Sequence, residues 1–511
     1  LETSYGNERT PDLSLWTGSR AGKWDYSATT EMFRTDGFVL VPVPYRGPVD
    51  TKANVEDATV YARIGRELPH KGRVFFRGNY FTEYRHNGTF LQTNDTTLGE
   101  GAGGLDQPLG NNDSLSLRIY GDAETYHQTY SSIASGRVSE TLTDKQHVPE
   151  QVVGGGAQWT HLLGESQTII AGMDLSEVIG ASQDVFFTGK NQAQTGSGRQ
   201  RALGWFGEDI FHCPKWTVIA AARVDDWSNF QGQTLVIPVS GPPSLTQFAD
   251  RRKLAFNPRL SVLRALNEHV SITGSAYRAF RAPTLNELYR PFRVGAILTL
   301  NNPLLTAERL TGAEAGMSIA GWNRRLQVRG TFFWSDIVDP VENVTIQTNP
   351  TINQKENLGR TRSRGVELEG VLRLRSDIQI TAGYVYTEAT VLSYPGNPGG
   401  VDLVGLDVPQ VPRSAFTWEA RYWNPSRLFA SVQGRFIGRQ FDDDLNTLPL
   451  DRFYTMNFEV GRAVNRHVEV FLAAENFTNQ RYQVARTPVV TVGPPILARV
   501  GLRLNFPAER K

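Results

Sequence analysis

The chain has 511 residues and a formal net charge of +1, with 10% aromatic residues, 21% charged residues and 48 glycines. The near-zero charge gives no electrostatic reason to expect nucleic acid as a partner. The single cysteine, Cys213, excludes an internal disulfide framework, and the even composition along the chain gives no sign of several soluble domains.

Alternation of apolar and polar residues runs through the chain and is clearest in its last third. It predicts strands at 366–374, 415–423, 428–439, 454–460, 468–475 and 496–506. In the first of these, Val366 and Leu368 fall on one face, and Glu367 and Glu369 on the other. Because successive strand residues point to opposite faces, each segment has one apolar side and one charged side.

The repetition of this pattern distinguishes two fold classes. A soluble sandwich can contain strands with one apolar face, but a barrel in lipid needs apolar-out, polar-in strands throughout. A charged inner face suits a wet lumen or a polar plug better than a dry core. We predict that the lumen-facing or plug-facing side chains include Glu367, Glu369, Glu419, Arg421, Arg435, Glu459, Glu469, Glu475, Arg499 and Arg503.

The connections between strands fall into two length classes. Short turns are predicted near 67–72, 163–165, 213–215, 321–323, 424–426 and 463–466. Long polar loops are predicted near 35–53, 98–111, 129–148, 181–198, 231–252, 283–306, 338–361, 391–410 and 440–451. Short periplasmic turns and long extracellular loops are typical of outer-membrane barrels. We therefore predict an all-β, transmembrane, antiparallel up-and-down barrel of roughly 22 strands.

Hydropathy does not contradict a membrane location. Mean hydropathy is −0.35, and no run approaches the roughly 18 apolar residues of a membrane-spanning helix. A transmembrane strand needs only about 9–11 residues, half of them apolar, so a barrel escapes such scales.

Four segments, in this order, resemble the barrel domain of the TonB-dependent outer-membrane receptors. The segment 277–289 reads YRAFRAPTLNELY, and 302–316 contains an Asn-Pro pair, Glu308 and a Glu-Ala-Gly triplet. The segment 357–369 runs from Asn-Leu-Gly to GVELE, and 474–482 reads AENFTNQRY. Together they resemble the family from about residue 1 to 506.

The resemblance implies a domain organisation and partners. We expect the barrel to span 1–506 and a tail to span 507–511, and we expect the family's N-terminal plug to be absent from this chain. The family imports scarce, large nutrients of the ferric siderophore or cobalamin class across the outer membrane of Gram-negative-type bacteria. The implied partners are outer-membrane lipid, a plug in cis or trans, the TonB complex acting through the plug, and the barrel-insertion machinery, which reads the last strand near Phe506.

Aromatic and arginine side chains in the predicted loops are the candidate ligand contacts. Aromatic faces and guanidinium groups suit a flat or anionic ligand such as a metal chelate, or a vitamin. The same side chains could instead pack loops against one another. The candidate ligand-binding residues are Phe186, Phe187, Arg251, Arg252, Tyr289, Arg290, Phe292 and Arg293.

Other motifs carry little chemistry. The carboxylates of Asp442, Asp443 and Asp444, with Asn446, could hold Ca²⁺, but a solvated loop is the favoured interpretation. The glycine-rich segment 99–104 matches GxGxxG but opens no helix in a βαβ unit, which predicts a flexible loop. No catalytic motif occurs, so we expect neither an enzyme nor a cofactor.

Two alternative functions remain open at this stage. A wide wet barrel is also the architecture of a diffusion porin, and long loops on a barrel anchor could serve adhesion. In the absence of a plug, we expect the barrel either to form a large open pore or to be inactive.

Overall fold

The computed structural model describes residues 1–294, 297–395, 402–424 and 428–506. Regular structure in these ranges is almost entirely β-strand, apart from short 3₁₀ turns and helix α1 (Leu285–Tyr289). Within the same ranges, no helix has the length and apolar character needed to cross a lipid bilayer. The predicted tail at 507–511 and most of the predicted turn at 424–426 lie outside the described residues.

A single large sheet of 23 strands forms the molecule's wall. One of them, β12 (Ser244–Gln247), pairs with the extracellular end of β11, beyond the part of β11 that pairs with β13. It is not a separate barrel strand, which leaves 22 barrel strands among the described residues. The barrel strands are β1 (Glu2–Gly6), β2 (Thr10–Ala21), β3 (Trp24–Val39), β4 (Lys52–Glu67), β5 (Arg73–His86), β6 (Thr93–Leu109), β7 (Asp113–Ile133), β8 (Glu140–Leu163), β9 (Gln167–Phe186), β10 (Asn191–Cys213), β11 (Trp216–Pro238), β13 (Arg251–Ala265), β14 (Val270–Arg281), β17 (Glu308–Gly321), β18 (Leu326–Val338), β21 (Arg360–Arg375), β22 (Ile378–Ser393), β23 (Ser414–Asn424), β24 (Leu428–Ile437), β27 (Phe453–Ala463), β28 (Val468–Glu475) and β31 (Leu497–Leu504).

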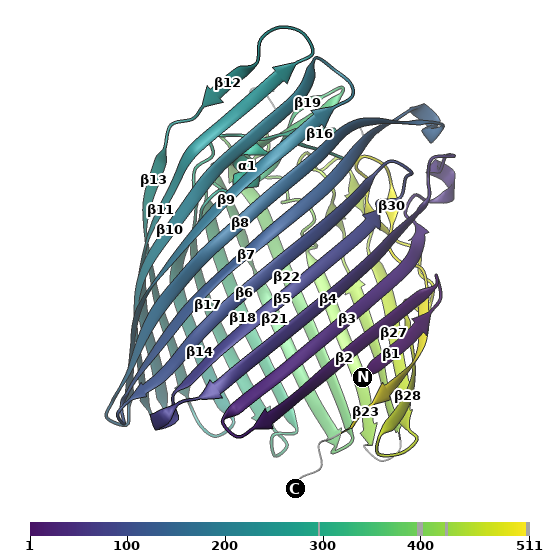
Figure 1. Ribbon diagram of the computed structural model, residues 1–511. Coiled ribbons are helices and arrows are strands. Elements are labelled where there is room, and N and C mark those ends of the chain that lie inside the picture. The colour runs from purple at the N-terminus through teal and green to yellow at the C-terminus, as the bar shows by residue number, and fades with distance from the viewer. Residues whose placement is uncertain (295–296, 396–401, 425–427, 507–511) are drawn as a thin grey trace.

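Each barrel strand pairs antiparallel with its neighbour, and β31 pairs back onto β1, so the sheet closes (Figure 1). Glu2 lies opposite Arg503 in this closing pair. The predicted all-β antiparallel barrel and its strand number are confirmed. Among the described residues, the main sheet therefore has no open edge at the level of the bilayer, where neighbouring strands can satisfy the backbone groups.

The two rims of the barrel differ as predicted. Short turns at 67–72, 163–165, 213–215, 321–323 and 463–466 connect strands on one rim, which is the periplasmic rim in such barrels. The opposite rim carries the long connections (Figure 1).

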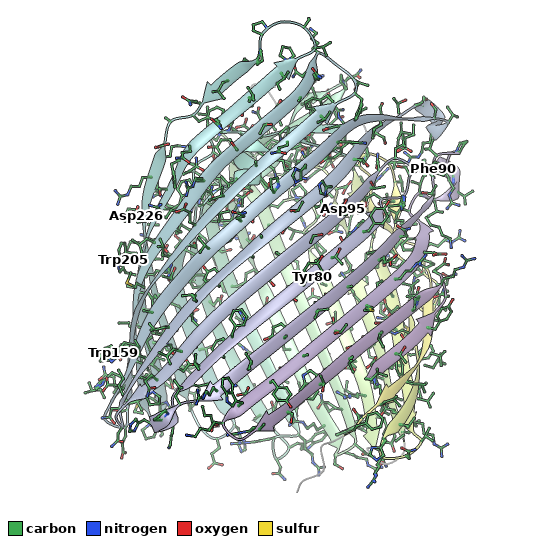
Figure 2. The ribbon with its side chains drawn as sticks, viewed as in Figure 1. Tyr80, Phe90, Asp95, Trp159, Trp205 and Asp226 are labelled. Atoms are coloured by element: carbon green, nitrogen blue, oxygen red, sulfur yellow. The ribbon has the colours of Figure 1, made fainter. Side chains whose placement is uncertain are left out.

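The outer face is apolar at the level of the bilayer. Tyr80, Trp159 and Trp205 project from the outer wall (Figure 2). Val366 and Leu368 are 38% and 47% exposed, on the face predicted to meet lipid. Aromatic and aliphatic side chains on this face suit contact with acyl chains.

Three loop predictions are wrong. Two fall where the strands on one side of the barrel continue well beyond the bilayer, and the third, 98–111, falls in the periplasmic half of a barrel strand whose glycine-rich sequence lacks the alternation. Residues 98–111 lie mostly in β6, and most of 129–148 and 181–198 lie in β7 to β10. β8 alone has 24 residues, whereas crossing the bilayer takes about 9–11. Above the bilayer both faces of a strand meet water, so the alternation that signals a strand disappears.

The glycine-rich segment 99–104 is part of this correction. It is not a flexible loop but the middle of β6, paired with both β5 and β7. The ring of Phe75 on β5 lies over Gly104, where a Cβ would meet it at 2.5 Å. A glycine there lets an aromatic ring lie flat against the sheet.

Short elements fill the extracellular end. The remaining short strands are β15 (Phe292–Val294), β16 (Ile297–Leu300), β19 (Val341–Thr348), β20 (Thr351–Asn357), β25 (Gln440–Phe441), β26 (Pro449–Leu450), β29 (Gln483–Ala485) and β30 (Thr491–Val492). The first four form one small sheet, and α1 lies behind β8 and β9 in Figure 1, within the outline of the barrel.

Candidate functional site

Helix α1 is held inside the barrel by its own sequence. Thr284 caps its first turn, with its hydroxyl accepting from Glu287 N and Glu287 Oε2 accepting from Thr284 N, a reciprocal capping box. Arg281, at the end of β14, donates to Glu287 and also pairs with Glu308 on β17. These contacts fix the helix relative to the wall.

A groove of glycines in the inner wall receives the helix. Gly180, Gly198 and Gly232 lie on β9, β10 and β11, and a Cβ at Gly198 would meet the Tyr289 ring at 2.6 Å. Tyr289 is only 2% exposed, and Asn229 Nδ2 donates to its hydroxyl at 2.7 Å. Only hydrogen side chains leave room for a helix this close to a sheet.

Two extracellular loops meet over this helix. Leu285, Leu288 and Tyr289 of α1 form a buried apolar cluster with Leu305 and Val341. The strands β16 and β20 pair in parallel, so the loop 282–307 and the loop 339–359 share one small sheet. The cluster is therefore a small hydrophobic core within the lumen.

A cavity of about 790 Å³ opens beside this core at the extracellular mouth, and we call it the mouth cavity. It lies between the upper ends of β7 to β10 and the segment that follows α1. Its lining combines two aromatic rings, Phe186 and Phe292, with Arg293 and the carboxyl group of Asp144. The other lining residues are Ser132, Ala134, Ser139, Thr141, Thr143, Thr188, Asn191, Gln194, Pro291, Leu298, Leu300 and Asn301.

A buried hydrogen-bond network anchors one side of the mouth cavity. Gln146 donates through Nε2 to Asp184 Oδ1 at 2.6 Å, and its Oε1 accepts from Arg290 Nε at 2.7 Å. Tyr130 also donates to this oxygen, and Gln146 Nε2 reaches the carbonyl oxygen of Pro291 at 3.3 Å. Because every partner is buried or half-buried, the network holds residues 290 and 291 against the wall.

Asp144 gives the mouth cavity a group that titrates near neutrality. Crossing the bilayer takes about 9–11 residues, so Asp144, near the extracellular end of the 24-residue β8, lies outside the membrane-spanning part. Burial, reinforced by the nearby Asp184 carboxylate, raises the pKa of Asp144 to about 7, against the opposing charge of Arg293.

The structure brings together part of the predicted ligand-binding set. Phe186, Phe292 and Arg293 line the mouth cavity. Tyr289 and Arg290 lie just beneath, where Tyr289 belongs to the buried core and Arg290 is bonded to Gln146. These two support the cavity rather than line it.

The other three predicted contacts lie elsewhere. Phe187 is exposed and stacks against the Lys145 ammonium group at 5.8 Å. Arg251 faces the lumen and donates to the carbonyl oxygen of Leu305 at 2.7 Å. Arg252 points to the outer face, where its Nε donates to Asp226 at 2.6 Å.

The predicted lumen-facing residues include one hub. Arg503 donates to Glu2, Glu459 and Glu469 at 2.9, 2.7 and 2.9 Å, and its guanidinium lies 4.4 Å from the centre of the Phe471 ring. The hub joins the first strand to the last three across the inner wall.

Other members of that set are spread over the wall. Glu367 and Glu369 line a second cavity, of about 290 Å³, beside Tyr277 and Glu314. Arg499 lies 3.7 Å from Asp12.

Some members make weaker contacts. Glu419 accepts from Gln433 at 3.4 Å. Within the described residues, no ion pair joins Arg421, Arg435 or Glu475 to a partner.

The three aspartates of the suggested calcium loop serve three different segments. Asp442 accepts from the backbone of Arg486 and Thr487, and Asp444 accepts from Thr345. Asp443 accepts from residues four and five positions further along its own loop. Among the described residues, no cluster of three or more His, Cys, Asp or Glu side chains has the arrangement of a metal site.

The sequence did not reveal Asp144, which lines the mouth cavity, or Gln146 and Asp184, which form the network beside it. Asp144, Gln146 and Asp184 were hidden in segments predicted as loops. Once these segments are known to be strands, the even-numbered positions 182, 184 and 186 of β9 share the inner face, and this alternation was the available signal.

The fold and the mouth cavity define a class of protein: a closed, lipid-facing barrel with an aromatic and cationic cavity at its extracellular mouth is a transport barrel. The family model described as TonB-dependent receptor-like β-barrel matches residues 24–477. The chain belongs to this family, as its motifs predicted. Its members are integral outer-membrane transport receptors and not enzymes, so the chain resides in the outer membrane.

Solved structures of similar fold include three receptors. The ferric-catecholate import receptor Fiu from E. coli K12, in its closed form, has a TM-score of 0.78 and 14% identity, covering 99% of this chain and 81% of that one. The siderophore receptor PiuA from Acinetobacter baumannii has a TM-score of 0.79 and 13% identity, covering 99% and 81%. The ferric yersiniabactin receptor FyuA from Yersinia pestis has a TM-score of 0.79 and 12% identity, covering 99% and 79%. At these identities the likeness is one of fold.

Proposed function

We propose that this chain is the barrel of a TonB-dependent importer that captures an anionic, aromatic metal chelate of the ferric siderophore class in its mouth cavity. The observation that carries this proposal is the cavity itself, where Phe186 and Phe292 offer aromatic faces and Arg293 offers a guanidinium group. A catecholate chelate is flat at each ligand arm and negatively charged overall, which matches both features.

The size of the mouth cavity supports a chelate as ligand. Its volume of about 790 Å³ falls within the range of roughly 300–1,000 Å³ typical of small-molecule sites. The similar structures Fiu, PiuA and FyuA are receptors for ferric catecholates, a siderophore and ferric yersiniabactin. A cobalamin would need the same family machinery, but it carries no net negative charge for Arg293 to neutralise.

Energy coupling belongs to the same proposal. We propose that a plug domain, supplied in cis or in trans, occupies the lumen against the inward-facing Glu and Arg side chains. The TonB complex would then act through that plug, and the barrel-insertion machinery would act on the last strand. Inward charges suit this role because a polar seat leaves a hydrated path when the plug moves.

Equilibrium binding of a ferric tris-catecholate chelate to the purified protein tests ligand capture. We expect Arg293→Ala to weaken binding about tenfold, because a charge-assisted contact is lost, and Phe292→Ala to weaken it by a smaller factor. Phe90→Ala is a matched control, since Phe90 is a 63% exposed aromatic residue outside the cavity (Figure 2). Equal binding by all three variants would refute the assignment of the cavity.

Uptake of the labelled chelate into cells with and without the TonB complex tests the coupling. We expect uptake only when the complex and a plug are both present. If uptake did not need the TonB complex and its rate rose in proportion to the external solute concentration, the protein would instead be a diffusion porin.

A further inference from the structure

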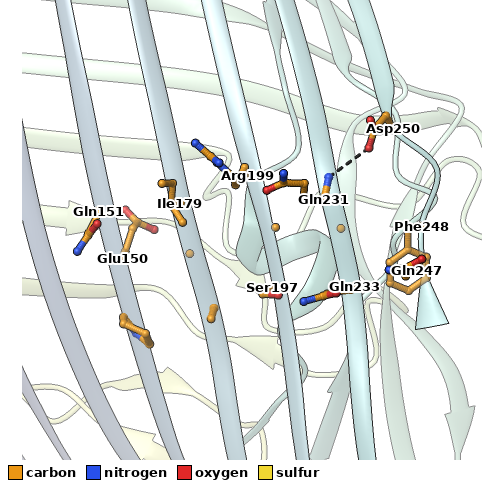
Figure 3. Close-up of a pocket in the computed structure, with 15 residues that line it drawn as sticks. Glu150, Gln151, Ile179, Ser197, Arg199, Gln231, Gln233, Gln247, Phe248 and Asp250 are labelled. Atoms are coloured by element: carbon orange, nitrogen blue, oxygen red, sulfur yellow. Dashed lines mark hydrogen bonds between the residues drawn. The ribbon is translucent and has the colours of Figure 1, made fainter. Parts of the chain in front are cut away.

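The outer face of the barrel wall, which faces away from the lumen, carries a groove. It has a volume of about 700 Å³ and is lined by pairs of outward positions on four strands. Figure 3 shows these side chains across the wall, with helix α1 behind the strands. We call it the outer-wall groove; its lining residues include Gln151, Ile179, Ser197, Arg199, Gln231, Gln233, Gln247 and Asp250.

Backbone irregularities create this groove. The pairing of β10 with β11 shifts register between Ser197 and Arg199, and Gln231 opposite has a left-handed backbone with φ of +55°. The strands β12 and β13 are interrupted between Gln247 and Arg251. In this interruption, the Asp250 carboxylate accepts a hydrogen bond from the backbone N–H of Gln231, with an N–O distance of 3.1 Å. The groove is therefore shaped by irregularities of the strands themselves and is not a gap between loops.

The height of the groove places it at the edge of the bilayer. A tilted strand covers the apolar band, about 25 Å tall, in roughly 9–11 residues. Ile179 lies just beyond that length in β9, counted from the periplasmic end at Gln167. Below the groove the outer wall is apolar, with Leu175, Val153 and Leu254 all exposed. The groove thus stands where acyl chains give way to headgroups.

The lower edge of the groove is cationic. Arg199 and Arg201 both pair with the single carboxylate of Glu177, so their combined charge is only half neutralised. Arg199 Nε is buried and has no hydrogen-bond partner among the residues that the structure describes. The ring of Phe230 lies 5.4 Å from each guanidinium group and holds both in place.

The rest of the groove is rich in amide groups. The side chains of Gln151, Gln233 and Gln247 line it, and their amides make no hydrogen bond within the described residues. Amides and the Asp250 carboxylate are donors and acceptors for sugar hydroxyl groups, whereas free guanidinium N–H groups suit a phosphate.

We propose that the outer-wall groove binds the phosphorylated sugar headgroup of a glycolipid in the outer leaflet. The phosphate binds at Arg199 and Arg201, the sugar hydroxyls meet the glutamine amides and Asp250, and the acyl chains lie along the apolar wall below. One amphiphilic ligand satisfies the cationic edge, the amide lining and the apolar surface together. The site is separate from the mouth cavity and does not depend on the proposed transport function.

Lipid retention by the purified full chain, measured by native mass spectrometry, tests this site. The probes are a diphosphorylated disaccharide lipid (lipid A), the same lipid without phosphates, and phosphatidylglycerol, which has a phosphate but no sugar. We expect the wild type to retain the diphosphorylated lipid about tenfold more strongly than either of the others.

Two variants and one control make the test specific. The double variant Arg199→Ala/Arg201→Ala should lose this preference, and Ser197→Trp should lose it by filling the groove without changing its charge. Arg34→Ala removes an exposed arginine from β3, away from the groove, and should behave as wild type. Heat-modifiable migration on gels identifies folded barrels. Equal retention of phosphatidylglycerol by the wild type, or unchanged retention by both groove variants, would overturn the proposal.

Discussion

Two sides of the barrel use strands of very different length. On one side, β7 to β11 run for 20–24 residues, and we call them the tall wall. On the other, β23 to β31 have 11 residues or fewer in each barrel strand, and we call them the short wall. Figure 1 shows the tall wall rising above the rest of the rim.

The difference separates two tasks. The strands of the short wall have about the length needed to cross a bilayer, and their inner face carries the Arg503 hub, which joins strands to one another. The strands of the tall wall extend above the bilayer, where both of their faces meet water. The tall wall carries the mouth cavity inside and the outer-wall groove outside, so both proposed binding sites lie where the strands are longer than the membrane requires.

Displacing helix α1 should have the largest effect on the tall wall. In Gly198→Leu the new side chain would overlap Tyr289 and move the segment that bears Phe292 and Arg293. We expect binding of the ferric chelate to fall about a hundredfold, and conductance in planar bilayers to rise as the lumen opens.

Gly207→Leu is the matched control for this variant. It lies on the same strand, where the nearest atom to a new Cβ is 3.9 Å away. If Gly207→Leu impaired chelate binding as much as Gly198→Leu, the glycine groove would have no special role.

Removing the hub should affect stability and not binding. Arg503→Met leaves the carboxylates of Glu2, Glu459 and Glu469 facing one another without their cation. Because Arg503 is partly exposed, we expect the free energy of unfolding by urea in vesicles to fall by about 1–2 kcal/mol. Arg435→Met, which breaks no ion pair among the described residues, should change it by less than about 0.5 kcal/mol. A larger loss in Arg435→Met would contradict the role given to the hub.

The titration of Asp144 should give chelate binding a pH dependence. Below its raised pKa of about 7 the carboxyl group is neutral, and above it a negative charge enters the mouth cavity. We therefore expect affinity for the anionic chelate to fall about threefold or more from pH 6 to pH 8. In Asp144→Asn this fall should disappear, and a steep fall that persists in the variant would assign it to another group.

Calcium should have the smallest effect of all. Asp442, Asp443 and Asp444 already accept hydrogen bonds from three separate segments. We expect Ca²⁺ to leave the urea midpoint and loop proteolysis unchanged. Protection of the loop 438–452 from proteolysis at micromolar Ca²⁺ would support the calcium-site hypothesis.

The sequence predicted the short wall more accurately than the tall wall. In the short wall, Leu472 and Val500 meet lipid while Glu469 and Arg503 meet the lumen, as the alternation predicted. The bilayer imposes that pattern because one face of each strand must be apolar. In the tall wall the constraint ends above the lipid, and strands were mistaken for loops.

The candidate site shows the same cause at the level of single residues. Phe186 and Phe187 were predicted to act together, as were Arg251 and Arg252, yet each pair is split between the two faces of a strand or its end. Neighbouring residues in a strand cannot share a face. Phe292 and Arg293, in the short strand β15 that follows α1, both line the mouth cavity, and their role in ligand binding stays a prediction.

The Arg503 hub has a consequence for assembly. Two of its partners, on β27 and β28, lie on the same side of the closing seam, whereas Glu2 on β1 lies across it, so the third hydrogen bond forms only when the two ends of the sheet meet in the correct register. A slip of one residue would turn Arg503 toward lipid and bring an apolar neighbour into the lumen. The hydrogen bond between Arg503 and Glu2 therefore favours the observed register of the closing seam over a shifted one.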